Sequence, residues 1–199
     1  VFAILPGSRV SEIDYMAAVF FQTALLLLKR YPKAQFLLPV ATAATRKRIS
    51  EILAQTEFAY LPITLTDKQS DTVCTAADVV LVTSGTATLE VALCKRPMVI
   101  SYKISPLTYA YVKRKIKVPH VGLPNILLGK AAVPELLQHD AVPEKLAQAV
   151  VDWYDRPEAV AALEQDFHAL HLLLKKDTAA LAAAAVLEEA GFSDGLKDK

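Results

Sequence analysis

One short stretch of the chain gathers small, hydroxyl-bearing and acidic side chains: Ser84, Gly85, Thr86, Thr88 and Glu90. It follows a continuous apolar run and precedes helix-forming residues, which predicts a buried strand, a tight turn and the first turn of a helix. Such a turn favours an anion, because Gly85 lets a ligand approach the backbone while the hydroxyls and first-turn N–H groups donate hydrogen bonds. Phosphate is the expected ligand.

Glu90 follows Thr86 by about one helical turn, so its carboxylate is placed to accept hydrogen bonds from neutral hydroxyls such as a ribose diol. A nucleotide would therefore satisfy both halves of the stretch. A structural explanation is open as well, since Thr86 or Thr88 capping the helix and Glu90 complementing its dipole account for the same residues without a ligand.

A second loop of this type follows the apolar residues 1–5. Gly7 frees the backbone, and Arg9 supplies a permanently charged planar fork suited to phosphate oxygens. Ser11 is the expected N-cap of the helix that comes next. An exposed arginine beside a structural turn is the alternative, but two such loops in one sheet reinforce each other, because a pyrophosphate needs more than one cluster of donors.

Strand patterns alternate with helical patterns along the chain. We expect strands at residues 1–5, 35–39, 63–66, 79–82 and 98–102. We expect helices after residue 11, over 42–54, within 67–77, and over 144–152, 158–175 and 178–190. This alternation predicts an α/β fold with a doubly wound parallel sheet. Ligands bind at the carboxyl ends of strands in such sheets, and both glycine turns are expected there.

The sequence pattern divides the chain into three parts. Residues 1–142 form the expected Rossmann-like domain, residues 143–190 are C-terminal helices that pack on it or on another body, and residues 191–199 are an expected disordered tail. The chain begins with Val1 in a strand-like run, so we expect it to be part of a longer protein. The apolar run 17–28 is too short to cross a bilayer and is expected to be a core helix.

The formal net charge of +1 argues against a general nucleic-acid binder, which usually carries a strong basic excess. Cys74 and Cys94 lack metal or redox spacing, which indicates core roles in a reducing compartment. His168 and His171 share one side of a helix without a third ligand, so we predict no metal site.

Residues 107–117 combine basic and aromatic side chains at helical spacing. Contact with an anionic membrane surface is one explanation, and a solvated helix face is another. The proline-rich loop that follows holds two polar residues in apolar surroundings, Asn125 and Glu135. On pattern alone, a turn-forming Asn and a Glu in the first turn of a helix are the default explanations.

Four motifs in this order resemble the lipid-A-disaccharide synthase family. They are Leu5-Pro6-Gly7-Ser8-Arg9 with Ser11-Glu12-Ile13, then Thr83 to Glu90, Leu123 to Leu127, and Val133 to Gln138. The resemblance runs over nearly the whole chain and matches the C-terminal half of that enzyme. It implies a GT-B architecture, in which this chain is the C-terminal Rossmann-like domain that binds the UDP-sugar donor, without its N-terminal partner domain.

The resemblance also implies an inverting hexosyltransfer that needs no metal or other cofactor. UDP-2,3-diacylglucosamine would donate its sugar to 2,3-diacylglucosamine 1-phosphate, giving lipid A disaccharide 1-phosphate and UDP. The implied donor-binding residues are Gly7, Ser8, Arg9, Ser84, Gly85, Thr86, Thr88, Glu90, Asn125 and Glu135. Among them Arg9 and Asn125 would serve turnover, Glu90 would hold the ribose, and Glu135 is the weakest assignment.

The resemblance places the catalytic base on the N-terminal domain, so this chain alone is predicted to bind UDP without turnover. It further implies a homodimer, contact with the inner membrane, and a cytoplasmic, membrane-peripheral location in a Gram-negative bacterium. Two rival hypotheses are a UDP-N-acetylglucosamine 2-epimerase-like enzyme, which needs additional acid–base residues, and a non-catalytic nucleotide-binding module, which need not prefer UDP.

Overall fold

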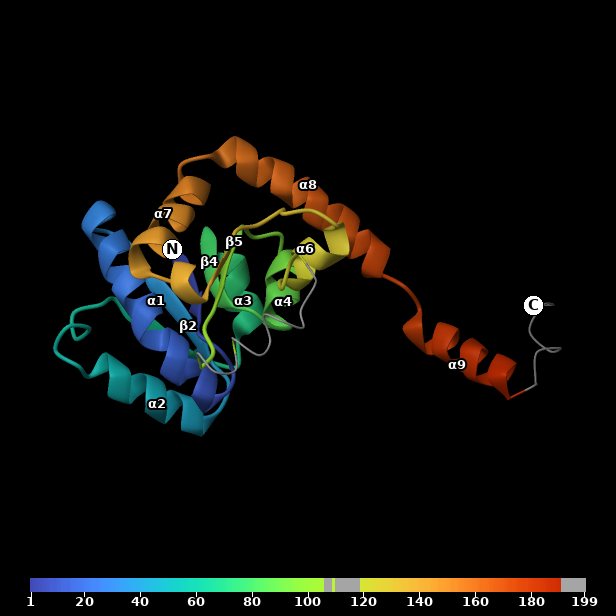
Figure 1. The fold of residues 1–199 in the computed structure, drawn as a ribbon, viewed down its shortest axis with the longest axis horizontal. Helices are drawn as coiled ribbons and strands as arrows, with labels where there is room; N and C mark the ends of the chain where they lie inside the picture. Colours follow the sequence, from blue (N-terminus) through green and yellow to red (C-terminus); the bar gives the residue numbers. More distant parts are fainter. Residues whose placement is uncertain (106–108, 110–118, 191–199) are drawn as a thin grey trace.

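A six-stranded sheet forms the centre of the computed structural model, which describes residues 1–105, 109 and 119–190 (Figure 1). Its strands are β1 (Phe2–Leu5), β2 (Phe36–Val40), β3 (Ile63–Asp67), β4 (Val79–Thr83), β5 (Met98–Tyr102) and β6 (Glu135–Leu137). All neighbours pair in parallel, in the order β3-β2-β1-β4-β5-β6. The predicted doubly wound α/β fold is confirmed, and the strand order reverses between β1 and β4.

Helices cover both faces of the sheet (Figure 1). One face carries α1 (Val10–Arg30), α2 (Ala43–Leu53) and α7 (Pro143–Tyr154). The other carries α3 (Ser70–Ala76), α4 (Ala87–Leu93), α6 (Leu123–Leu128) and α8 (Pro157–Leu174). A short 3-10 turn, η1 (Gln138–Asp140), follows β6, and α9 (Thr178–Glu189) ends the described chain.

The alternation of side chains along each strand divides the core into two layers. Phe2 and Ile4 join the cluster beneath α1 and α7, whereas Ala3 and Leu5 join the cluster beneath α3, α4 and α8. The residues of β4 alternate in the same way. Because both faces are covered, the central strands are apolar throughout, as is typical of parallel sheets.

The helix α1 is long and apolar enough to cross a membrane by length and composition alone. Its Phe20 and Phe21 are fully buried within the protein, in one cluster with Phe36 and Leu38 of β2. The helix contains the whole apolar run 17–28. Its packing is that of a core helix, as the sequence indicated.

The helices α7 and α8 belong to the same core as the sheet. Leu146 and Val150 of α7 pack in the cluster beneath α1, and Phe167 of α8 packs in the other cluster. The Trp153 Nε1–H donates to the Met98 carbonyl at 3.0 Å, which ties α7 to β5. In contrast, α9 extends away from the body and buries none of its residues (Figure 1).

Two local predictions were wrong. The helix α1 begins at Val10 with Arg9, rather than Ser11, at its N-cap, because the Glu12 carboxylate accepts the loop N–H groups. The expected loop after residue 119 contains α6 and β6, since Leu123 begins a helix with Pro124 in its first turn and Glu135 begins an edge strand. The predicted basic helix 107–117, apart from Tyr109, and the tail 191–199 lie outside the described residues.

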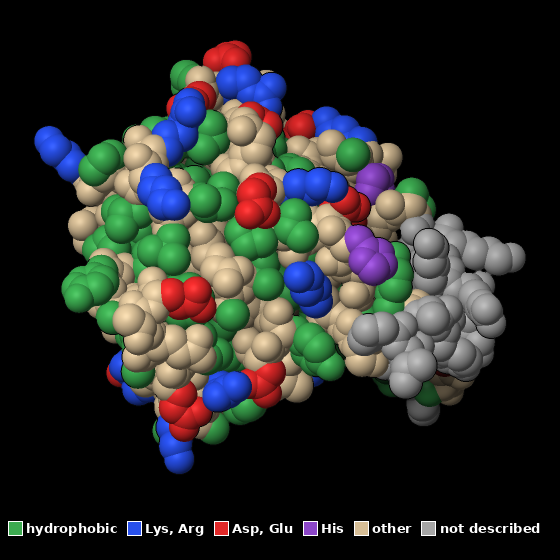
Figure 2. Space-filling view, turned by 60° about the vertical axis from the view of Figure 1, so that its left-hand side comes forward, with side chains coloured by type: hydrophobic (Ala, Val, Ile, Leu, Met, Phe, Trp, Pro, Cys, Tyr) green, Lys and Arg blue, Asp and Glu red, His purple; other side chains and the backbone are tan. Residues whose placement is uncertain are grey.

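Basic and acidic side chains are interspersed on the face shown in Figure 2, in keeping with the net charge of +1. Arg48, for example, bonds both Asp14 and Glu51, at 2.6 and 3.1 Å. Exposed pairs of this kind contribute about 0–1 kcal/mol each. The stability of the fold therefore rests mainly on the two apolar clusters.

Asp155 joins the end of α7 to the end of α1. Its carboxylate accepts hydrogen bonds from Tyr31 Oη and Arg30 Nη2, both at 2.8 Å. The Tyr31 hydrogen bond, followed by that of Arg30, lowers the pKa of Asp155. A carboxyl group whose pKa is lower in the folded state stabilises the protein above its unfolded pKa, and this stabilisation is lost as the pH falls through the folded pKa.

We therefore expect Asp155→Asn to lower the midpoint of urea unfolding slightly at neutral pH. The difference from the wild type should shrink as the pH falls below about 3.9, the ordinary aspartate pKa, and through the folded value. Asp152→Asn is the matched control, because the Asp152 carboxylate accepts from the neutral amide of Gln148. A difference that stays constant with pH would contradict the assignment.

Candidate ligand-binding site

A cavity of about 520 Å³ opens beside the carboxyl ends of β1 and β4, where the strand order reverses. Its volume lies within the range of about 300–1,000 Å³ that is usual for small-molecule sites. Seven predicted site residues line it: Gly7, Ser8, Arg9, Ser84, Gly85, Thr86 and Glu90. Leu5 pairs with Val82, so the loops after β1 and β4 start side by side. The register of the sheet brings the two predicted loops to one site.

The two glycines have different roles. Gly85, at a φ of 156°, has no atom of the described residues within 4 Å of the position that a Cβ would occupy, so its backbone is open to a ligand on that side. Gly7, at a φ of 128°, is closed, because a Cβ there would lie 2.5 Å from the Glu12 Cβ. The prediction that glycine exposes the backbone therefore fits Gly85, whereas Gly7 makes room for Glu12.

Glu12 holds the loop after β1 in place. Its Oε2 accepts from the Ser8 and Arg9 N–H groups at 2.9 and 3.2 Å, and its Oε1 accepts from Arg9 Nη1 at 3.2 Å. The Arg9 side chain nevertheless stays 78% exposed at the cavity. The loop thus presents one oriented guanidinium, while its own N–H groups at Ser8 and Arg9 already have an anionic partner.

The loop after β4 is less constrained. Ser84 Oγ donates to the Val121 carbonyl at 3.3 Å, and Thr86 is the N-cap residue of α4 without a side-chain cap bond. Glu90 is exposed at the cavity, where Ser70 Oγ lies 3.5 Å from its Oε2. Its carboxylate therefore has acceptor capacity left for neutral hydroxyls.

Thr88 has a partner within the turn that leads into α4. It is fully buried, it is not among the described cavity residues, and its hydroxyl donates to the Gly85 carbonyl at 2.7 Å. Its position supports the structural alternative, in which a hydroxyl stabilises the turn that leads into α4. The assignment of Thr88 to the donor phosphates stays a prediction.

Asn125 and Glu135 form a polar network outside the described cavity lining. The buried Asn125 amide donates to the Val133 carbonyl and to Glu135 Oε1, both at 2.8 Å, and accepts from the Val133 N–H at 2.9 Å. Glu135 also accepts from the Val121 and Gly122 N–H groups at 2.9 and 3.0 Å. Glu135 thus holds the segment 121–122 and Asn125 holds Glu135 and Val133, and their assignment as donor contacts stays a prediction.

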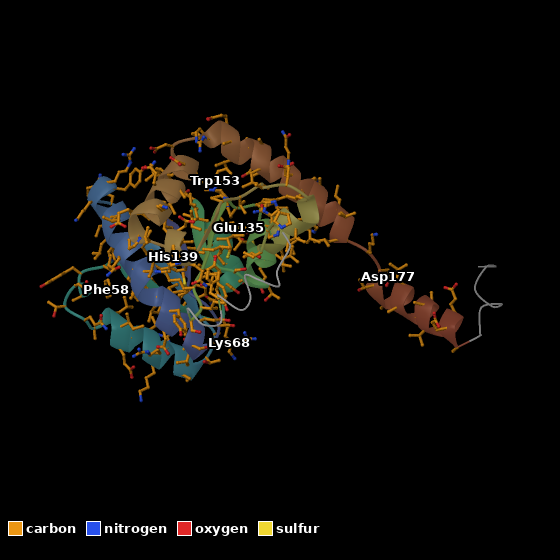
Figure 3. The ribbon with its side chains drawn as sticks, in the orientation of Figure 1. Phe58, Lys68, Glu135, His139, Trp153 and Asp177 are labelled. Atoms are coloured by element: carbon orange, nitrogen blue, oxygen red, sulfur yellow. The ribbon has the colours of Figure 1, made fainter. Side chains whose placement is uncertain are left out.

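Several cavity residues were absent from the predicted set: Glu12, Val40, Lys68, Ser70, Thr83 and Tyr102. Most of them end a strand or follow one directly, and Lys68, at a φ of 51°, lies at the edge of the body in Figure 3. The rule that parallel sheets bind ligands at their carboxyl ends could have found these residues. Glu12 has a different signal, the capping spacing after Arg9.

The described residues contain no cluster of three or more His, Cys, Asp or Glu side chains placed to hold a metal ion. Cys74 is buried, which raises the pKa of its thiol to about 12. A thiol with so high a pKa is a poor nucleophile at neutral pH, so its role is in packing.

The fold is that of GT-B glycosyltransferases. The E. coli ADP-heptose lipopolysaccharide heptosyltransferase II matches 79% of this chain and 47% of its own with a TM-score of 0.55 at 14% identity. A pneumococcal O-GlcNAc transferase solved with UDP and GlcNAc matches 84% of this chain and 32% of its own with a TM-score of 0.53 at 15% identity. At such low identity these matches define the fold.

Sequence comparison defines the family. The family model described as lipid-A-disaccharide synthetase matches residues 1–188, and the chain belongs to this family. The lipid-A-disaccharide synthase of Neisseria meningitidis serogroup A is 83% identical over 96% of this chain and 50% of its own length. That of Chromobacterium violaceum is 56% identical over 96% of this chain and 49% of its own. The chain thus spans about half the length of these relatives.

A Cβ would meet Glu12 at Gly7 but no described atom at Gly85, so the two glycines should differ in the unfolding free energy that is lost on substitution by alanine. Alanine at any of these positive-φ positions should cost about 1–3 kcal/mol of unfolding free energy through backbone strain. Gly7→Ala should cost more than Gly85→Ala, the matched control, because a Cβ at Gly85 meets no atom of the described residues within 4 Å. Urea unfolding measures both, and equal losses would contradict the role of Gly7 in accommodating Glu12.

Proposed function

We propose that this chain is the donor-binding half of an inverting glycosyltransferase. The full-length enzyme joins UDP-2,3-diacylglucosamine to 2,3-diacylglucosamine 1-phosphate and releases lipid A disaccharide 1-phosphate and UDP. The observation that carries the proposal is the cavity in which Arg9, the open Gly85 backbone and the Glu90 carboxylate meet. Membership of the synthase family supports this reaction over an epimerase or a non-catalytic module.

The chemistry of the cavity suits a nucleoside diphosphate. Negative charge grows on the β-phosphate as UDP departs, and the exposed Arg9 guanidinium supplies a fixed positive charge without a metal ion. The Glu90 carboxylate suits the ribose diol, which offers neutral O–H donors. The catalytic base and the acceptor site belong to the N-terminal domain, so this chain alone binds UDP without turnover.

The exposed apolar side chains of α9 support the proposal that another protein surface covers this helix. Its Leu181, Val186 and Leu187 are exposed, and the helix extends away from the sheet domain (Figure 1). Exposed apolar side chains of this kind indicate a covering surface. The N-terminal domain and a second protomer are the two proposed partners for α9.

Calorimetric titration tests donor binding directly. UDP should bind this chain, and ADP and GDP should bind more weakly. Glu90→Ala should weaken UDP binding by about tenfold, the scale of a hydrogen bond to a charged group. The same substitution should leave the affinity for 2′,3′-dideoxy-UDP unchanged, because that analogue has no diol. If UDP does not bind, repeating the titration on the full-length protein separates an incomplete site from an incorrect assignment.

Steady-state kinetics of the full-length transferase test Arg9. Arg9→Ala should lower kcat/KM by about 10²–10³-fold, which is the cost of removing a preorganised donor at developing charge. Arg48→Ala is the matched control, because Arg48 bonds Asp14 and Glu51 on the helical surface. A wild-type kcat/KM in Arg9→Ala would rule out this role for Arg9.

A further inference from the structure

Thr83, the last residue of β4, has a buried hydroxyl group without a hydrogen-bond partner among the described residues. The residue is 4% exposed, and no hydrogen bond reaches its Oγ1. Five other fully buried polar residues have hydrogen-bond partners: Thr23, Thr45, Thr88, Ser101 and Asn125. Among the described residues, two further buried side-chain atoms have none, Thr66 Oγ1 and Arg96 Nε, and neither residue is among the described cavity residues. An unsatisfied buried hydroxyl destabilises a protein, so its presence at this position requires an explanation.

The position of Thr83 points to a ligand. Side chains alternate along β4, so Thr83 lies on the same face as Val79 and Leu81, which pack beneath α1. At the end of the strand that face opens into the cavity, and Thr83 lines it together with Arg9. Thr83 therefore stands at the cavity beside residues of the loop after β1 and of the loop after β4, with its Oγ1 shielded from solvent.

The neighbouring hydroxyls show why Thr83 differs. Ser84 Oγ donates to the Val121 carbonyl, and Thr88 Oγ1 donates to the Gly85 carbonyl. Thr86 is exposed, so water can satisfy its hydroxyl. Among the hydroxyl residues from Thr83 to Thr88, only Thr83 is buried, lines the cavity and has a hydroxyl without a partner in the described part of the chain.

We propose that the Thr83 hydroxyl donates a hydrogen bond to a phosphate oxygen of the bound nucleotide. This inference rests on the proposed function and adds a donor residue to it. A hydroxyl without a competing partner gains a full hydrogen bond when an anionic oxygen arrives, and hydrogen bonds to charged acceptors are among the stronger ones. Binding of the nucleotide would thus supply the partner that the Thr83 hydroxyl lacks among the described residues.

Titration of the full-length protein with UDP, combined with urea unfolding without ligand, tests the contact. Thr83→Val keeps the branched shape of the side chain and removes only the hydroxyl. It should weaken UDP binding by about tenfold or more without lowering the unfolding midpoint. Thr83→Ser should keep most of the affinity. Uridine, which has no phosphate, should bind the wild type and Thr83→Val alike.

Thr66→Val is the matched control. Thr66 of β3 also has a buried, unpartnered Oγ1, but it is not among the described cavity residues. This control should keep its UDP affinity. Unchanged UDP affinity in Thr83→Val, or equal losses for UDP and uridine, would overturn the contact. A wild type that does not bind UDP would instead overturn the proposed function on which the contact rests.

Discussion

The parallel pairing of β1 with β4 is the constraint on which the rest of the structure depends. It joins segments far apart in the chain, with Phe2 opposite Val79 and Leu5 opposite Val82. Because the strand order reverses at this pair, the two following helices pack on opposite faces of the sheet and leave a crevice between their first residues. A shift of one residue in this register would exchange the two core faces of β4 and separate the two loops.

Polar groups near the crevice divide into those satisfied within the protein and those left open. Glu12, Thr88, Asn125 and Glu135 make several or short hydrogen bonds to backbone groups, which fixes the shape of the surrounding loops. Arg9 and Glu90 remain exposed to the cavity. A sequence motif does not distinguish these two kinds of polar residue. A residue that shapes the loop and a residue that is exposed to the cavity can stand side by side in the same motif.

Much of the fold was predictable from the sequence, because apolar runs such as 79–82 and 98–102 and the intervening helical patterns are local signals. The edge strand β6 was missed, since three half-buried residues after a proline carry little periodicity. The predicted roles of Thr88 and Asn125 depended on side-chain direction. Whether a hydroxyl or amide finds a backbone partner is decided by tertiary contacts such as the one between Asn125 and Val133, which the sequence does not reveal.

The charges around the cavity favour a ligand that carries both an anionic group and neutral hydroxyl groups. The described lining carries two cationic side chains, Arg9 and Lys68, and two carboxylates, Glu12 and Glu90. Glu12 is already bonded to Arg9 and to loop N–H groups, so Glu90 is the carboxylate with capacity to spare. An inorganic phosphate would use the cations and be repelled by Glu90, whereas a nucleoside diphosphate brings both an anion and a neutral diol. Electrostatic complementarity of this kind selects between ligands more than it adds raw affinity.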